Sequence, residues 1–257
     1  MEVKLNLNKT VEQNAEHYFD KAKKYKKKLP GIMKTIEQYR LKAVNLQEEQ
    51  KTKIVKVPAR KKLWYEKFRW FNSSDGFLVI GGRDATTNDI IIKKHAEPHD
   101  VVFHTELPGS PFVIIKNNDA KEIPASTLQE AAEFCASYSK SWKSGRMNAE
   151  VYHINPDQLS KEAPSGMAGL AKGSFMVNGK RNFMDVMLNI GICNVDGMVM
   201  AGPLTAIKNA SDKYVEIIPG DAKLSDVAKS VQKIIGGDLD EIIRALPPGC
   251  MIRKQKK

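Results

Sequence analysis

The chain is poor in cysteine and has no long apolar run. Its three cysteines, Cys135, Cys193 and Cys250, lie far apart and lack the paired spacing of zinc sites or disulfide frameworks. We therefore expect free, buried thiols. No apolar run approaches the ~18 residues that a membrane helix requires, and the first residues lack the apolar stretch of a signal peptide. These absences predict a cytoplasmic protein that does not enter a membrane.

Most of the chain has no net positive charge, although the net charge of the whole is +11. Residues 1–62 hold 17 Lys or Arg against 7 Asp or Glu, residues 253–257 add +4, and residues 63–252 therefore sum to −3. Lys and Arg that neutralise phosphates supply most non-specific affinity for nucleic acid. We expect the amino-terminal arm and the tail to attract a polyanion, whereas the central part must bind through local geometry.

The amino-terminal arm has a helical pattern. From Val11 to Leu29 the apolar positions step alternately by four and three, and the same steps resume at Ile32 after Pro30-Gly31. Thr10 and Gln13 have the spacing of a helix-capping box. We interpret the arm as two short helices joined by a tight turn, an antiparallel coiled-coil hairpin. The lysines near its tip form either a solvated helical face or an RNA contact.

Aromatic residues make up only 7% of the chain, so their concentration in LWYEKFRWFNSSDGFLVIGGRDA (63–85) is informative. Trp64, Phe68 and Phe71 have helical spacing, which predicts a helix with one buried side and cations on another. A turn, a strand and the Gly81-Gly82 corner follow, and the corner presents Arg83 and Asp84 at the strand end. Of the three tryptophans in the chain, we expect two in the core and one available for base stacking.

The residues of this segment resemble those of a known protein family. The run WYEKFRWFNSSDGFLVIGGRDATTN resembles the signature of NFACT-R, the RNA-binding domain of the NFACT family. The similarity continues through DVVFHTELPGSPFVIIKN, the Ser-Lys-Ser-Trp at 139–142, and GSFMVNGKRNF. The arm sequence NAEHYFDKAKKYKKKL resembles the entry into the family's coiled-coil arm, and the last 73 positions resemble the carboxy-terminal extension of archaeal-type members.

The resemblance implies an RNA-binding protein that acts on tRNA or on rRNA of the large ribosomal subunit, in quality control of stalled nascent chains. The NFACT-N and helix-hairpin-helix domains of full-length members are not found before the arm. A separate NFACT-N-type protein is therefore an expected partner, and tail elongation by this chain alone is not expected.

The predicted fold is α+β, with three parts. A coiled-coil hairpin occupies 1–57, an NFACT-R domain 58–184, and a small α/β extension 185–257. The NFACT-R part is expected to be a mixed sheet with two main helices, near 86–96 and 124–143, because strands predominate there.

Candidate RNA-binding residues are cations, polar groups and one histidine at strand ends, at the Gly81-Gly82 corner or in the arm. In chain order they are Lys24, Lys27, Lys28, Arg60, Lys61, Arg69, Arg83, Asp84, Asn88, His104, Lys116, Lys161, Lys180 and Arg181. Arg83 either holds a phosphate beside a capping Asp84 or is only the salt-bridge partner of that cap. His104 either bonds or stacks on a base or is a satisfied core histidine.

The alternative is an RNA-processing or RNA-modifying enzyme with Arg83, Asp84 and His104 in one cleft. No spacing gives a nucleophile with its base, and the corner lacks the Gly-Lys-Ser/Thr of a phosphate loop. His95 and His99 also come close to His104 in sequence, but no cysteine or carboxylate set completes four metal ligands. We therefore expect a binding protein without a cofactor or a metal.

Overall fold

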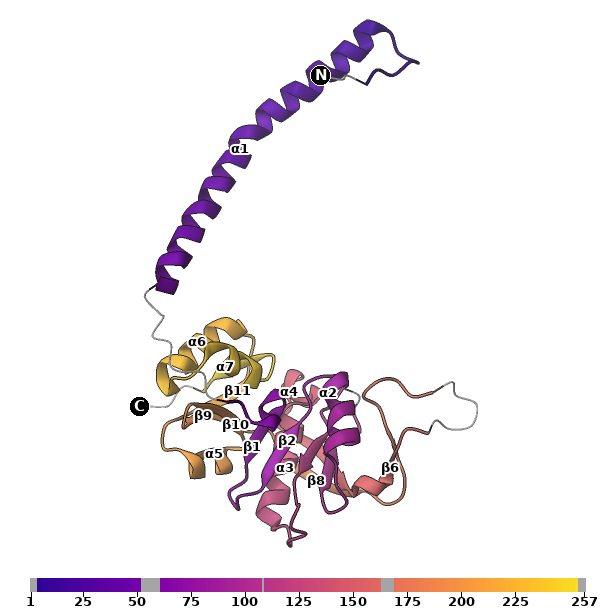
Figure 1. Ribbon diagram of the computed structural model, residues 1–257, viewed down its shortest axis with the longest axis vertical. Coiled ribbons are helices and arrows are strands. Elements are labelled where there is room, and N and C mark those ends of the chain that lie inside the picture. The colour runs from indigo at the N-terminus through magenta and orange to yellow at the C-terminus, as the bar shows by residue number, and fades with distance from the viewer. Residues whose placement is uncertain (1–3, 52–60, 108, 163–168, 254–257) are drawn as a thin grey trace. The chain divides into compact units, whose positions relative to one another are not determined.

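The computed structural model describes residues 4–51, 61–107, 109–162 and 169–253, and for 41–51 it describes only the backbone. The described chain divides into two compact units, Met1–Lys61 and Lys62–Lys257. The first contains one long helix, and the second contains two larger sheets, a short two-stranded sheet and the remaining helices (Figure 1).

The arm is one continuous helix, α1 (Val11–Lys51), and the predicted hairpin is wrong. Pro30 lies inside the helix, which bends along its length (Figure 1). Proline removes one backbone hydrogen bond and favours a bend, but it need not end a helix. The step from Leu29 to Ile32 is itself three residues, so the apolar pattern passes Pro30 without losing its phase. That continuity is the physical sign of a single helix.

The predicted capping box at the start of α1 is confirmed. The Thr10 N–H donates to Gln13 Oε1 at 3.2 Å, and the Gln13 N–H donates to Thr10 Oγ1 at 3.3 Å. Two backbone donors that have no partner within the helix are thereby satisfied.

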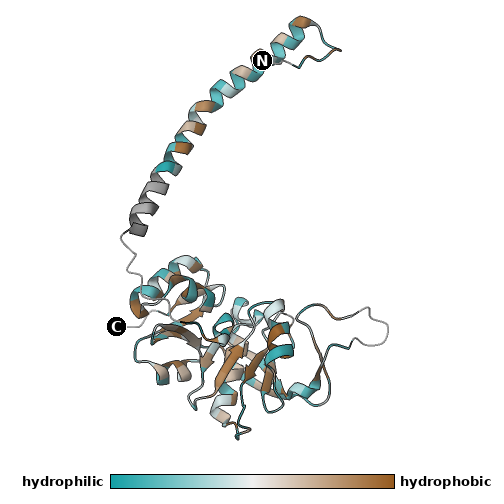
Figure 2. Ribbon diagram, viewed as in Figure 1, coloured by the Kyte–Doolittle hydropathy of each residue, from teal (hydrophilic) through white to brown (hydrophobic). Residues whose placement is uncertain are grey.

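The main sheet of the second unit has six strands in the order β1-β2-β4-β3-β5-β8. Every pairing in it is antiparallel, so the sheet is not mixed as predicted, although the α+β class is confirmed. Figure 2 shows apolar residues concentrated on its strands. The strand bounds are β1 Arg69–Asn72, β2 Leu78–Gly81, β3 Val101–His104, β4 Val113–Ile115, β5 Asn148–Ile154 and β8 Asn182–Met187.

Helices and short elements connect these strands. Helix α3 packs on β3, β4, β5 and β8, and it carries buried Phe134 and Cys135 against them. The predicted helix near 86–96 consists of a short α-helix and a π-helical turn. The bounds are η1 Trp64–Lys67, α2 Ala85–Ile90, η2 Ile91–His95, α3 Ala125–Ser137, α4 Lys140–Lys143, η3 Pro156–Gln158, β6 Leu159–Ser160 and β7 Met176–Val177.

The aromatic segment 63–72 is not the predicted amphipathic helix. One turn of 3-10 helix, η1, leads directly into edge strand β1, in which Trp70 and Phe71 are both buried. Trp70 and Trp142 are 7% and 1% exposed, whereas Trp64 is 46% exposed. The expectation of two core tryptophans and one accessible tryptophan is therefore confirmed.

The extension forms a four-stranded antiparallel sheet in the order β10-β9-β11-β12. Strand β10 lies beside β1, and a Cβ at Gly202 would come within 2.8 Å of the Phe71 side chain. Tyr138 Oη donates to the Ala245 carbonyl at 2.5 Å, and Trp142 Nε1 donates to the Gly249 carbonyl at 3.0 Å. The bounds are β9 Ile190–Val195, β10 Met198–Gly202, α5 Leu204–Ala210, β11 Tyr214–Pro219, α6 Leu224–Ile235, α7 Leu239–Ala245 and β12 Cys250–Ile252.

One apolar core runs through both larger sheets, so 62–257 is one compact unit. The predicted domain boundary at 57/58 lies outside the described residues, and the boundary at 184/185 stays a prediction. All three cysteines are free and buried, as expected. In the described part of the chain, no helix is both long and apolar enough to cross a membrane.

Candidate nucleic-acid interface

A groove of about 570 Å³ lies along one end of the main sheet, and it contains five of the predicted site residues. Arg69, Arg83, Asp84, Asn88 and His104 all line it. The remaining walls come from the segment before β4, the turn between α3 and α4, and the loop before β7. Cations outnumber carboxylates on this surface. The lining cations are Arg69, Arg83, Lys140, Lys143 and Lys172, and Asp84 is the lining carboxylate.

The Gly81-Gly82 corner brings the chain from β2 into this groove. A Cβ at Gly82 would lie 1.8 Å from Asn88 Oδ1, and one at Gly81 would lie 2.9 Å from the Phe134 ring. Asn88 uses the space: its Oδ1 accepts from the Phe112 N–H at 3.1 Å, and its Nδ2 donates to the Ser110 carbonyl at 3.4 Å. The absence of a side chain at the corner is therefore required, as predicted. Asn88 joins α2 to the segment before β4, and its side-chain amide is used in these two hydrogen bonds.

Asp84 is a helix cap. Its Oδ1 accepts from the Thr87 N–H at 2.8 Å, and hydrogen bonds to Thr87 are the main cause of its lowered pKa. Among the described residues no ion pair joins Arg83 to Asp84, so Arg83 is not the salt-bridge partner of this cap. Burial lowers the pKa of Arg83, and Arg244 contributes next. The Arg83 guanidinium is thus half-buried, and none of the described carboxylates forms an ion pair with it.

Arg69 is held more firmly. Its Nη1 donates to the Gly82 carbonyl at 2.7 Å, and its guanidinium carbon lies 4.4 Å from the Tyr138 ring centroid, a cation–π distance. Its Nε is buried and has no hydrogen-bond partner among the described residues. Burial lowers the pKa of Arg69, although the group stays protonated at neutral pH.

His104 and Phe175, which are half-buried, form an aromatic surface in the groove together with Phe112, which is only 3% exposed. The His104 ring stacks on Phe112 with centroids 4.3 Å apart, and its Nδ1 lies 3.5 Å from Tyr152 Oη. Phe175 meets Phe112 edge to face at 5.5 Å. Burial lowers the pKa of His104, so the imidazole is neutral at pH 7. A neutral ring beside other aromatic faces suits stacking against a base.

Sequence reasoning missed three groove cations, Lys140, Lys143 and Lys172. Lys140 and Lys143 are on the short helix α4, which Ser139 caps by accepting from the Ser141 N–H at 3.1 Å. The Ser-Lys-Ser-Trp motif held the signal, because buried Trp142 turns its lysine neighbours outward.

Lys116 is engaged inside the protein, which corrects its assignment as an RNA contact. Lys116 is 8% exposed and pairs with fully buried Asp100 at 2.6 Å, and it also donates to the His95 carbonyl at 2.7 Å. Its ammonium balances a buried carboxylate and is not available to RNA.

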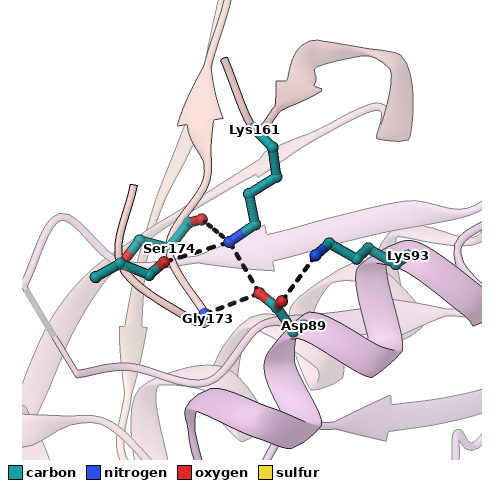
Figure 3. Close-up of polar contacts among 6 residues, drawn as sticks. Asp89, Lys93, Lys161, Gly173 and Ser174 are labelled. Atoms are coloured by element: carbon teal, nitrogen blue, oxygen red, sulfur yellow. Dashed lines mark hydrogen bonds and ion pairs between the residues drawn. The ribbon is translucent and has the colours of Figure 1, made fainter. Parts of the chain in front are cut away.

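Lys161 also has an internal role, in a polar cluster around Asp89 (Figure 3). Its Nζ lies 2.9 Å from Asp89 Oδ1 and donates to the Ser174 carbonyl at 2.7 Å. The Gly173 N–H and Lys93 also bond to Asp89, at 2.8 and 2.9 Å. The cluster fixes the loop before β7 on helix α2, and that loop forms one wall of the groove. These contacts hold the pKa of Asp89 well below its usual range.

Comparison with known proteins shows which domain family and which proteins this chain is similar to. A family model described as "NFACT protein RNA binding domain" matches residues 67–179. The archaeal Rqc2 homolog aRqcH of Methanocaldococcus jannaschii is 36% identical over 219 residues, which are 82% of this chain and 32% of that protein. The chain contains the RNA-binding domain of the NFACT family.

Two animal relatives in the NFACT family match over shorter stretches. The ribosome quality control complex subunit NEMF homolog of Drosophila melanogaster is 42% identical over 175 residues, 66% of this chain and 17% of that protein. Human ribosome quality control complex subunit NEMF is 38% identical, with 66% and 16% covered. The chain therefore spans about a third of the archaeal relative's length and about a sixth of each animal relative's.

All five cations of the groove lie within the NFACT-R match, whereas Lys180 and Arg181 follow it. Arg181 pairs with Glu106, and its guanidinium carbon lies 5.0 Å from the Tyr152 ring centroid. Lys180 is exposed, and its ammonium has no hydrogen-bond or ion-pair partner in the part of the chain that the structure describes. Arg181 thus contacts Glu106 and Tyr152, whereas Lys180 is accessible to a ligand.

The remaining predicted residues belong to the first unit. Lys24, Lys27 and Lys28 are exposed on α1, and Lys61 is exposed at the end of the unit. Arg60 lies outside the described residues. A contact of any of these residues with RNA stays a prediction.

Proposed function

We propose that this chain binds RNA through the groove and acts in ribosome-associated quality control, on tRNA or on rRNA of the large ribosomal subunit. The observation that carries the proposal is the grouping of five cations with an aromatic surface in one groove. Cations bind the phosphate backbone and aromatic faces bind unpaired bases, a combination suited to single-stranded or looped RNA. The names of the relatives support the quality-control role. The ribosome implies a cytoplasmic location.

The balance of charge strengthens this interpretation. Asp84 is the one carboxylate among the described residues that line the groove. It accepts hydrogen bonds from the Thr87 backbone and hydroxyl, so it offsets little of the positive charge facing a ligand. Residues 63–252 are acidic as a whole, with a net charge of −3. Five cations grouped within this acidic part of the chain are better explained by contacts with the phosphates of a bound polyanion than by a general contribution to solubility.

We propose binding without catalysis. Asp84 is held as a cap, and His104 stacks on Phe112, so neither is set as a base beside a nucleophile. The names of the relatives mention no catalytic activity. A separate NFACT-N-type protein stays a predicted partner.

The test is a titration of labelled tRNA with the full chain and with a Lys140→Gln, Lys143→Gln double variant. Both lysines are exposed, so the fold should persist, and affinity at fixed salt should fall roughly tenfold or more. The slope of log K against log salt should decrease by roughly 1.5, since each lost phosphate contact removes about 0.7 to 0.9.

The matched control is Lys229→Gln with Lys233→Gln. These residues are exposed on α6 and lie outside the groove, and the change in net charge is identical. Equal losses of affinity in the two double variants would show that the groove is not the binding site. A gel of the recovered tRNA completes the test, because shortened or altered RNA would contradict binding without catalysis.

A further inference from the structure

A small recess of about 40 Å³ adjoins the groove, and Arg69, Arg83 and Tyr138 line both. Its other side comes from the extension, where Glu241 and Arg244 project from α7. The volume accommodates about three water-sized groups, which is room for the oxygens of one small anion. Three guanidinium groups, from Arg69, Arg83 and Arg244, therefore share one small space.

The three arginines have no ion-pair partner among the described residues. Arg69 is held by the Gly82 carbonyl and leaves a buried Nε without a hydrogen bond. Arg244 Nε donates to the Asp240 carbonyl at 3.1 Å, and no described residue accepts a hydrogen bond from its two Nη atoms. Buried charged donors without partners cost free energy, so such sites normally bind a counter-charge.

Carboxylates in the recess do not supply that counter-charge. Glu241 pairs with Lys62 at 2.7 Å, and Glu66 accepts from the Leu63 N–H in the cap of η1. Both acids are thus engaged at the rim. The positive charge of the arginine cluster remains for a ligand that brings several acceptor oxygens.

We propose that Arg69, Arg83 and Arg244 form a subsite for a single phosphate group. The inference rests on the proposed function, since the phosphate is one of the bound RNA. Guanidinium groups bind phosphate oxygens in pairs of parallel hydrogen bonds, which lysine cannot reproduce. Arg244 lies outside the family-model match, so the extension completes a site that the NFACT-R domain begins.

The first experiment needs no RNA. Thermal unfolding of the full chain is measured in inorganic phosphate and in chloride at equal ionic strength. Phosphate should raise the melting temperature of the wild type and of Lys229→Gln, the charge-matched control on α6. Arg244→Gln should lose most of this rise. Arg244→Lys should lose much of it as well, because it keeps the charge but not the paired donors. Arg244 is on the exposed side of α7, so these variants should fold.

The second experiment titrates tRNA into the same proteins. Arg244→Gln should bind roughly tenfold more weakly than Lys229→Gln. A phosphate-induced rise of the same size in Arg244→Gln as in the wild type would overturn the subsite. Equal tRNA affinity in the two variants would overturn its use by RNA. If phosphate stabilises only proteins with Arg244 while no protein binds tRNA, the phosphate subsite is supported and the proposed RNA function fails.

Discussion

At the scale of the residue, Asp89 shows how a group outside the groove controls its shape. Its carboxylate accepts from Lys161, Lys93 and the Gly173 N–H, which joins α2 to the loop before β7. A Cβ at Gly173 would meet Ala85 Cα at 2.6 Å, so the loop lies directly on the start of α2. The wall of the groove that contains Lys172 therefore depends on one carboxylate.

We expect Asp89→Asn to lower the free energy of unfolding by roughly 1 kcal/mol at pH 7, because charged hydrogen bonds are lost. The folded-state pKa of Asp89 is depressed, so its stabilisation is present above the unfolded pKa of about 3.9 and is lost as pH falls below it. Denaturant unfolding at several pH values should show a gap between wild type and variant that closes below about pH 4.

Asp119→Asn is the control, since Asp119 pairs with Lys121 at 2.7 Å on the exposed surface. A gap that persists unchanged in acid would show that packing of the Asn side chain, and not ionisation of Asp89, causes the loss.

The sequence predicted Arg83, Asp84 and His104 together because strand ends and a Gly-Gly corner are local signals. The sequence could not show that Lys116 and Lys161 pair with carboxylates of the protein, unlike lysines whose ammonium groups face only solvent. A lysine at a strand end has the same local sequence whether its ammonium meets water or a buried carboxylate. The partners, Asp100 and Asp89, are distant in the chain and become neighbours only when the sheet and the loop before β7 are formed.

At the scale of the element, α1 illustrates how a local breaker signal competes with periodicity. Pro30-Gly31 indicates a turn, whereas the unbroken alternation of four and three indicates one helix. The periodicity prevailed here: Pro30 removes one backbone hydrogen bond, and that cost is smaller than the loss of helical structure that a chain reversal would cause. In the segment 63–72 the opposite happened: helical spacing of aromatics was overridden by pairing of Arg69–Asn72 with β2.

Spin labels can test the continuity of α1. Labels on Asp20→Cys and Glu37→Cys flank Pro30, and native cysteines are buried and should not react. A continuous helix separates the two positions by about 26 Å. A hairpin would bring them to about 10 Å, the spacing of packed helices. A distance distribution centred on the short value would restore the hairpin.

The two parts of the chain carry positive charge in different ways. The arm carries most of the excess positive charge, whereas the groove holds five cations at fixed positions. Residues 1–62 have a net charge of +10, whereas 63–252 have a net charge of −3. Diffuse charge raises affinity for any polyanion, and placed contacts select among RNA shapes.

The variant Lys24→Gln, Lys27→Gln, Lys28→Gln should therefore weaken binding to tRNA and to heparin by similar factors. The salt slope for tRNA should decrease by roughly 2. Lys213→Gln, Lys229→Gln, Lys233→Gln provides the same change in charge on exposed positions of the extension. If both triple variants bind tRNA with unchanged salt slopes, the arm does not supply the long-range attraction.

The hydrogen bonds from Tyr138 to Ala245 and from Trp142 to Gly249 have a thermodynamic consequence. Tyr138 and Trp142 line the groove, and their hydrogen bonds join it to the extension. A ligand that binds the groove and orders Tyr138 and Trp142 must therefore make local unfolding of the extension less favourable. By reciprocity, opening of the extension lowers affinity for that ligand by the same coupling free energy.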